Sequence, residues 1–336
     1  MNPDPTSEEY YLGVDTGATK TQVLICDQAG KIKAFVSGGP GNPQSIGGFS
    51  ALKELLSKLF QNVCEKAGIA PAEIRAAGLG LAGYDWPSQK ERFCQLARDA
   101  GLPEKLELVN DAGLGIFAGT SAGWGVCVAA GTSFNCRGRG QDGREAIAIG
   151  DGMRWGEGTG ALELALKAAQ SVIAEFTMRG PETRLTRLFL KTFGSSSLAE
   201  LVEGIVTGRH RVTAALAPQI IEVAQQNDPA AQDAVRWAAE SLADLAKGAI
   251  RQLGLIGQPC EVVLSGSFFK AGDIIIAPLK RSVLRLAPFA SFHLLDLPPV
   301  CGGALLAIEE VRGMSISERN EIKDKMKEFF NKESAG

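Results

Sequence analysis

The sequence of 336 residues contains few histidines and no paired cysteine motif. Its two histidines, His210 and His293, have no partner at ligand spacing, which argues against a histidine-based metal site and a Ser-His-Asp triad. None of the seven cysteines forms a C-x-x-C pair, and several lie within apolar runs. We therefore expect buried, reduced thiols in a cytoplasmic protein, and neither disulfides nor cysteine-bound metal.

The chain also lacks an excess of charge and a long apolar segment. Its 35 basic and 38 acidic residues give a net charge of −3, which disfavours nucleic acid or an anionic membrane as the main partner. No apolar run reaches the roughly 20 residues that a membrane span needs. Residues 1–9 are polar and acidic, unlike a signal peptide. A hydrophobic fraction of 45% suffices for cores, and the length predicts about two domains of roughly 150 residues.

A glycine turn lies between two apolar segments within residues 12–27. The pattern predicts a β-hairpin whose tip binds phosphate. Gly17 permits a turn with positive φ and leaves backbone N–H groups uncovered. Thr19, Lys20 and Thr21 add two hydroxyls and a cation that suit phosphate oxygens. Asp15 is suited to hold Mg²⁺ through water. An ordinary tight turn is the alternative.

The order of the expected elements predicts an α/β protein. The first third reads as βββαβαβ, which implies a mixed sheet with helices on both faces. Its further strands are expected at 31–37, 77–82 and 106–109, and its helices at 52–63 and 88–100. The second series has expected strands at 125–130, 134–139, 145–149, 260–265 and 292–295, and helices at 158–176, 182–192, 197–207, 211–227, 229–254 and 302–311.

Both halves of the chain open with an antiparallel meander and a glycine-threonine turn. This repetition suggests two related domains that face each other across a cleft. We expect the domains at residues 1–112 and 113–312, with the helix at 313–336 packing back onto the first.

Two further segments extend the nucleotide-binding pattern. Gly131-Thr132 follows an apolar strand, and the apolar strand within 262–267 ends at Gly266 and Ser267. Such paired turns resemble the actin, hexokinase and Hsp70 superfamily of ATP-dependent phosphotransferases. There, two turns hold the nucleotide phosphates between two lobes, and a late strand ending in glycine supports the adenosine. A buried strand followed by a helix start is the alternative for 262–267.

Two carboxylates that follow strands are candidates for chemistry. Asp111 comes after the strand at 106–109, where a general base could accept the proton of a sugar hydroxyl. The alternative is an Asn110-Asp111 helix cap. Asp85 follows the strand at 77–82, and we interpret it as a helix cap or a loop carboxylate in preference to a cleft residue.

The whole pattern resembles the BadF/BadG/BcrA/BcrD-type ATPases, and specifically their N-acetylglucosamine kinase-like branch. The resemblance runs from about residue 11 to residue 308. Its carriers are VDTGATKT (14–21), GPGNP (39–43), GLGLAG (78–83), NDA (110–112), AAGTSFN (129–135), GEGTG (156–160), LSGS (264–267) and GGA (302–304). The resemblance implies two ribonuclease H-like (actin-like ATPase) domains flanking an ATP cleft, the use of ATP and Mg²⁺, and a homodimer.

The resemblance also implies roles for single residues. Thr19 and Thr132 would contact ATP phosphates, Asp111 would be the base, and Asn42 would hydrogen-bond the sugar with help from the 150–157 loop. The candidate residues are Asp15, Gly17, Thr19, Lys20, Gly131, Thr132, Gly266 and Ser267 for ATP; Asn42, Asp111, Gly150, Asp151 and Glu157 for the sugar; and Asp15 for Mg²⁺.

The sequence departs from this branch at two places. Ser133 and Phe134 stand where the branch has Gly and Ser, and the larger Phe134 side chain is expected to intrude on the phosphate or sugar side. Asp151 stands where the branch has Trp, and Glu157 alone remains of a carboxylate pair. Because polar groups in a site reject wrong ligands strongly, these changes could alter the substrate. Asp151 also fits a surface turn.

Three hypotheses for function follow. The leading one is an ATP-dependent kinase that phosphorylates a small sugar, in particular an amino sugar such as N-acetylglucosamine or glucosamine. The second is an ATPase that activates a partner enzyme, like the acyl-CoA dehydratase activators, which hold an iron–sulfur cluster through cysteines; Cys127 and Cys136 lie near the expected cleft. The third is a sugar- or nucleotide-sensing module without turnover, which the changes at Phe134 and Asp151 favour.

Overall fold

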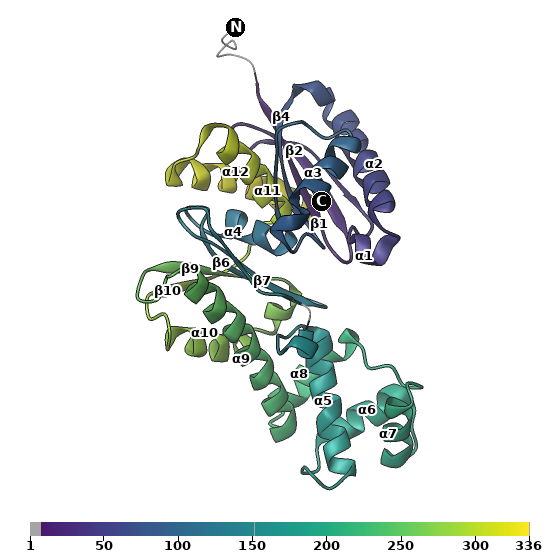
Figure 1. The fold of residues 1–336 in the computed structure, drawn as a ribbon. Helices are drawn as coiled ribbons and strands as arrows, with labels where there is room; N and C mark the ends of the chain where they lie inside the picture. Colours follow the sequence, from purple (N-terminus) through teal and green to yellow (C-terminus); the bar gives the residue numbers. More distant parts are fainter. Residues whose placement is uncertain (1–7, 151, 336) are drawn as a thin grey trace. The chain divides into compact units, whose positions relative to one another are not determined.

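The computed structural model describes residues 8–150 and 152–335 (Figure 1). It divides into two compact units. Unit 1 comprises the described parts of Met1–Cys127, Arg137–Glu145 and His293–Gly336, and unit 2 comprises those of Val128–Cys136 and Ala146–Phe292. These units differ in extent from the domains expected at 1–112 and 113–312, whose boundaries stay a prediction.

The first sheet is mixed, as expected. Its strands are β1 (Tyr10–Thr16), β2 (Thr21–Asp27), β3 (Ile32–Gly38), β4 (Ile74–Leu81) and β5 (Leu106–Asn110), in the order β3-β2-β1-β4-β5. The pairs β1–β2 and β2–β3 are antiparallel, and β1–β4 and β4–β5 are parallel. The carboxyl ends of β1, β4 and β5 therefore meet at one edge, where Thr16 pairs with Leu81 and Leu81 with Asn110.

Helices cover both faces of this sheet (Figure 1). The helices of unit 1 are α1 (Pro43–Ile46), α2 (Phe49–Ala67), α3 (Lys90–Asp99), α4 (Leu114–Gly119), α11 (Pro299–Arg312) and α12 (Ile316–Ala335), with short 3-10 turns η1 (Pro71–Glu73), η2 (Pro87–Gln89) and η3 (Asp111–Gly113). Alternate strand residues face opposite sides. Leu12 and Val14 share a core with α2 and α3, whereas Tyr11 and Leu24 share one with α11 and α12.

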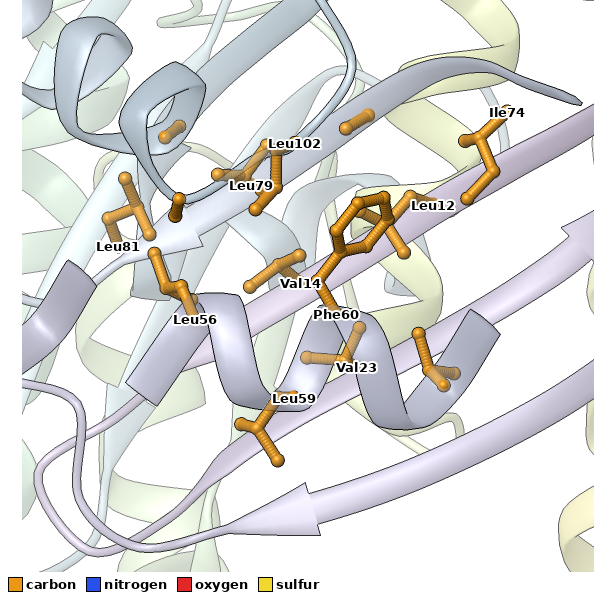
Figure 2. Packing of buried hydrophobic residues seen from close by; sticks show 14 of the residues in the cluster. Leu12, Val14, Val23, Leu56, Leu59, Phe60, Ile74, Leu79, Leu81 and Leu102 are labelled. Carbon is orange, nitrogen blue, oxygen red and sulfur yellow. The ribbon is translucent and has the colours of Figure 1, made fainter. Parts of the chain in front are cut away.

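The α2 helix forms where the spacing of its leucines predicts one. Leu56 and Phe60 lie one turn apart and pack in the same core as Val14 and Val23 of the sheet (Figure 2). The helix ends at Gly68, whose φ of 66° satisfies the left-handed cap.

Glycines bring α11 against the backbone of the sheet. A Cβ on Gly13 would lie 2.4 Å from the carbonyl oxygen of Val300, and one on Gly78 would lie 2.1 Å from that of Gly303. Only glycine permits this approach, which explains the small residues of the GLGLAG motif. Met326 of α12 is buried in the core on the same side, so the C-terminal segment packs onto the first sheet.

The second sheet has the order β10-β9-β6-β7-β8. Its strands are β6 (Gly125–Ala130), β7 (Phe134–Arg139), β8 (Glu145–Ile147), β9 (Cys260–Ser265) and β10 (Ala290–Leu294). The helices of unit 2 are α5 (Ala161–Phe176), α6 (Arg184–Phe193), α7 (Leu198–Val206), α8 (Ala217–Gln225), α9 (Pro229–Gln252) and α10 (Asp273–Leu284), with η4 (Gly152–Trp155), η5 (Ala214–Leu216) and η6 (Ser267–Ala271).

Two helix predictions in unit 2 need correction. The helix expected from 158 begins only at Ala161, because Gly158 adopts a φ of +87° that a helix does not accept. The single helix expected at 211–227 is the turn η5 followed by α8.

All seven cysteines are buried, which confirms the expectation of buried thiols. Within 8–150 and 152–335, no helix combines the length and the apolar character that crossing a membrane requires.

Candidate functional site

The turn between β1 and β2 is the predicted hairpin, and the GPGNP loop is tied to it. Gly17 N–H donates to the carbonyl oxygen of Lys20 (2.9 Å), and Gly41 N–H donates to that of Gly17 (2.9 Å). A Cβ on Gly41 would lie 2.5 Å from Thr21 Oγ1, so this loop needs glycine to approach the hairpin. Thr19 and Lys20 are exposed at the tip, where they are accessible to a ligand.

Thr16 is a structural residue of this edge that the sequence did not reveal. Its side chain is fully buried, its Oγ1 accepts from the Ala82 N–H (3.0 Å), and its hydroxyl donates to the carbonyl oxygen of Gly80 (3.4 Å). These bonds fix the end of β1 against the end of β4. The available signal was a threonine next to Asp15 at the start of the glycine turn.

Asp15 and Asp111 lie at the same edge of unit 1, at the ends of β1 and β5. Burial raises the pKa of Asp15 to about 7; the charge of Asp111 adds to this rise and Lys20 opposes it. Burial also raises the pKa of Asp111 to about 6, an effect that the Ala112 N–H opposes and the Asp85 charge reinforces. The structure therefore brings two predicted site carboxylates within electrostatic reach, each inclined to hold a proton or attract a cation.

Asn110 makes the helix cap that was the alternative for this segment. Its Oδ1 accepts from the Ala112 N–H (3.1 Å), which begins η3. The Asp111 Oδ1 accepts from the same N–H (3.0 Å). The cap is thus made largely by Asn110, and Asp111 stays available as a candidate base.

Asp85 is a loop carboxylate and not a helix cap. The Gln89 side chain accepts from the N–H groups of Asp85 (2.8 Å) and Trp86 (2.9 Å) at the start of η2. The Asp85 Oδ1 instead accepts from Arg137 Nη2 (3.0 Å) and from Asn110 Nδ2 (3.0 Å). Sequence reasoning missed Arg137, one of the two arginines of β7, because the sequence does not show which of them is buried in an ion pair.

Asn42 joins the same edge of unit 1. Its side-chain Oδ1 caps α1 by accepting from the Gln44 N–H (3.0 Å). A Cβ on Gly83, which has a φ of +81°, would lie 3.2 Å from this oxygen. The structure therefore brings Asn42 next to the loop that carries Asp85, in the unit that also holds Asp15 and Asp111.

In unit 2, the Gly131-Thr132 turn contacts the start of α5. The N–H groups of Ala161 and Leu162 donate to the carbonyl oxygens of Gly131 (2.9 Å) and Thr132 (3.3 Å). At Gly266, the end of β9 packs directly against the end of β6. This residue has a φ of +107°, and a Cβ there would lie 2.1 Å from the carbonyl oxygen of Ala130. Conformation and close approach both require glycine.

A cavity of about 680 Å³ opens between these elements of unit 2. The predicted residues Gly131, Thr132 and Ser267 line it. Its other lining residues, which sequence reasoning missed, are Ala161, Ala214, Ala215, Ala217, Pro218, Ile221, Phe268, Lys270 and Ala271. A mostly apolar hollow with a few polar groups and one cation suits a flat aromatic base with a charged tail.

The 150–157 loop is organised by Glu157, whose carboxylate accepts from the N–H groups of Ile149 and Gly150. Glu157 and Gly150 are thus brought together, and the predicted contact of Asp151 lies outside the described residues. Phe134 is only 6% exposed, and its ring lies where a Cβ on Gly158 would be, so it packs beneath the glycine loop. Gly158 leaves space for this ring, and the expectation that the ring intrudes on the phosphate or sugar side stays a prediction.

No cluster of three or more His, Cys, Asp or Glu side chains suited to a metal occurs in the parts of the chain that the structure describes. Cys127 and Cys136 are fully buried.

The model of the BadF/BadG/BcrA/BcrD ATPase family matches residues 12–307. The chain belongs to this family. Over 177 residues it is 30% identical to an N-acetylmuramic acid/N-acetylglucosamine kinase of Clostridium acetobutylicum, a match that covers 53% of this chain and 58% of that relative. It is 24% identical to an N-acetyl-D-glucosamine kinase of Dictyostelium discoideum, over 90% of this chain and 98% of the other. This chain is thus a distant homologue of N-acetylglucosamine kinases.

Two solved structures share the fold. A candidate N-acetylglucosamine kinase from Chromobacterium violaceum has a TM-score of 0.67 at 24% identity, over 89% of this chain and 98% of the other. A ROK family glucokinase from Streptomyces griseus, in complex with glucose and AMPPNP, has a TM-score of 0.53 at 20% identity, over 89% and 99%. The chain therefore shares the fold of these two structures, and it contains two five-stranded sheets.

Proposed function

We propose that this family member is an ATP-dependent kinase that phosphorylates a hydroxyl group of an amino sugar, such as N-acetylglucosamine or glucosamine. The observation that carries the proposal is the pair of partly buried carboxylates, Asp15 and Asp111, at the strand ends of unit 1. The names of both curated relatives support a sugar as the acceptor.

Asp111 is the proposed general base. A sugar hydroxyl is a weak nucleophile, and a carboxylate that accepts its proton assists attack on the γ-phosphoryl group. A pKa of about 6 leaves Asp111 mostly ionised at neutral pH, while keeping it basic enough to take the proton. Its bond from the Ala112 N–H fixes one carboxylate oxygen and leaves the other for the acceptor.

Asp15 is the proposed holder of Mg²⁺. Its carboxylate is partly buried beside a second carboxylate, and a few carboxylates completed by water are the ligands that Mg²⁺ favours. When bound, the cation would neutralise charge on the phosphates. Asp15 would then stay ionised at neutral pH and orient the water molecules of the metal through its oxygens.

ATP is the proposed occupant of the unit 2 cavity. The apolar residues would surround the base, with Gly266 and Ser267 beside the nucleoside, while Gly131 and Thr132 would turn their backbone toward the phosphates. Lys270 adds a cation for a phosphate oxygen. In unit 1, Gly17, Thr19 and Lys20 are proposed as the second phosphate-binding turn.

The sugar is proposed to contact Asn42 and the 150–157 loop. The hydrogen bonds of Glu157 to the N–H groups of Ile149 and Gly150 would give this loop one shape. Glu157 therefore acts on the sugar chiefly by holding Gly150, and the contact of Asp151 stays a proposal from sequence. We also propose a homodimer, which light scattering of the purified chain would test.

The test is ADP release by the purified chain with Mg²⁺ and ATP in the presence of single sugars. The panel contains N-acetylglucosamine, glucosamine, N-acetylmannosamine, N-acetylmuramic acid and glucose. Asp111→Asn should lose the sugar-dependent release, whereas the matched control Asp99→Asn, an exposed carboxylate on α3, should keep it. If the chain binds ATP but releases no ADP with any sugar of the panel, the proposal is contradicted. A sensor or an activator of a partner enzyme would then be favoured.

A further inference from the structure

A buried cation lies two hydrogen bonds away from Asn110, the residue that caps the turn carrying Asp111. Arg137, on β7, has a side chain that is 7% exposed and donates through Nη2 to Asp85 Oδ1 at 3.0 Å. The same carboxylate oxygen accepts from Asn110 Nδ2 at 3.0 Å. The Asp85 side chain is 27% exposed, so this ion pair is largely shielded from water.

Asn110 connects this ion pair to the segment that follows β5. Its Nδ2 donates to the carbonyl oxygen of Tyr84 (3.1 Å) as well as to Asp85. Its Oδ1 accepts from the Ala112 N–H, the group that also donates to Asp111. A continuous chain of hydrogen bonds therefore runs from Arg137 through Asp85 and Asn110 to the backbone that orients the Asp111 carboxylate.

The chain of bonds joins three segments that are distant in sequence. Asp85 follows β4, Asn110 ends β5, and Arg137 belongs to β7. A buried guanidinium left without its carboxylate is strongly unfavourable, so Arg137 holds Asp85 in one position. Asp85 in that position gives the Asn110 amide one orientation, because Nδ2 and Oδ1 then have different partners.

We propose that Asp85 and Arg137 are positioning residues for Asp111, which fix the Asn110 amide and through it the η3 turn. The proposal rests on the proposed function to the extent that Asp111 is the base. Neither side chain needs to contact the substrate. Their loss should misplace the carboxylate of Asp111 and lower kcat, while the KM for ATP, whose proposed cavity lies in unit 2, should not change.

Two double variants separate the hydrogen bond from the charge. Asp85→Asn with Arg137→Gln removes both charges but keeps an amide oxygen for Asn110 Nδ2. Asp85→Ala with Arg137→Gln removes the same charges and the oxygen. Because a misplaced catalytic group costs about 100-fold in rate, we expect that loss in kcat for the alanine pair and a loss of no more than about threefold for the asparagine pair.

Amide hydrogen exchange, measured by mass spectrometry, gives a readout that needs no turnover. Peptides covering 110–116 should exchange faster in the alanine pair than in the asparagine pair, while peptides of α2 stay unchanged. Faster exchange along the whole chain would indicate general destabilisation and contradict a specific role. Equal kcat and equal local exchange in the two pairs would overturn the proposal.

A milder variant covers the case in which the alanine pair does not fold. Arg137→Lys keeps the cation but loses the planar fork. It should lower kcat about tenfold at an unchanged KM for ATP, and an unchanged kcat would contradict the proposal. If the native chain phosphorylates no sugar, the proposed function fails, and the local exchange of 110–116 alone then decides the positioning role.

Discussion

The candidate site of unit 1 consists of charged and amide side chains that contact one another, whereas that of unit 2 consists of backbone turns and apolar walls. In unit 1, Asp85, Asn110 and Arg137 form one hydrogen-bonded network. In unit 2, Gly131 and Gly266 bring strand ends together beside a mostly apolar cavity. Under the proposed function, unit 1 would supply the base and the charged groups, and the cavity of unit 2 would supply the shape that holds the nucleotide.

The largest expected effect comes from removing the proposed base in unit 1. Asp111→Asn keeps the shape of the side chain but cannot accept the proton, so kcat should fall by about 10²–10⁴-fold. The affinity for ATP should stay within a small factor, because the variant changes neither the cavity of unit 2 nor the proposed phosphate-binding turn of unit 1. Steady-state kinetics and isothermal titration with ATP would measure the two quantities. An equal loss of kcat and of ATP affinity would contradict the separate roles proposed for the two units.

The corresponding change in unit 2 is Gly266→Ala. The new Cβ would meet the carbonyl oxygen of Ala130 at 2.1 Å, and the φ of +107° is strained for alanine. We expect nucleotide affinity to fall by about tenfold or more and the melting temperature to fall by several degrees. Gly248→Ala, a helical glycine in α9 with open space around its Cβ position, is the control and should not weaken ATP binding. If Gly266→Ala bound ATP as tightly as the native chain, the turn at Gly266 would have no part in nucleotide binding.

The pH dependence of turnover should report the carboxylates of unit 1. The pKa of Asp111 is raised to about 6, and a base works only when ionised. The kcat/KM for the sugar should therefore be level above pH 7 and fall about tenfold per pH unit below 6. ATP affinity measured over the same range would show whether unit 2 shares this dependence. A flat kcat/KM between pH 5 and 8 would contradict the role of Asp111.

The smallest expected effect is on stability. The pKa of Asp15 is raised to about 7, so the folded chain binds this proton more tightly than the unfolded chain does. The resulting stabilisation is present below the unfolded pKa of about 4 and is lost as the pH rises through about 7. Asp15→Asn should then raise the melting temperature of the metal-free chain by about 2–4 °C at pH 8, and not at pH 4. An equal change at both pH values would exclude ionisation as its cause.

The local elements of the fold followed from sequence because their signals are local. The hairpin of β1 and β2, the leucine spacing of α2 and the expected strands lie where apolar periodicity and glycine turns predict them. The start of α5 was predicted too early, because the positive φ of Gly158 belongs to a loop that wraps the Phe134 ring.

The partners of the site residues were harder to predict, since they come from distant segments. The sequence identified Asp85 and Asn110 but not Arg137, which is 52 residues from Asp85. Lys270 was missed because a lysine after a strand is usually a solvated surface residue. The packing of Phe134 was also out of reach, because sequence shows the size of a side chain but not the space that a neighbouring glycine, here Gly158, leaves for it.

The division of the chain into units has a consequence for its synthesis. The first sheet is made from residues near the N-terminus, but the core that contains Tyr11 and Leu24 is covered by α11 and α12, between residues 299 and 335. A ribosome releases the chain from its N-terminus. The part of that face that α11 and α12 cover therefore stays exposed while Ala146–Phe292 emerges. Unit 1 is thus begun first and completed last.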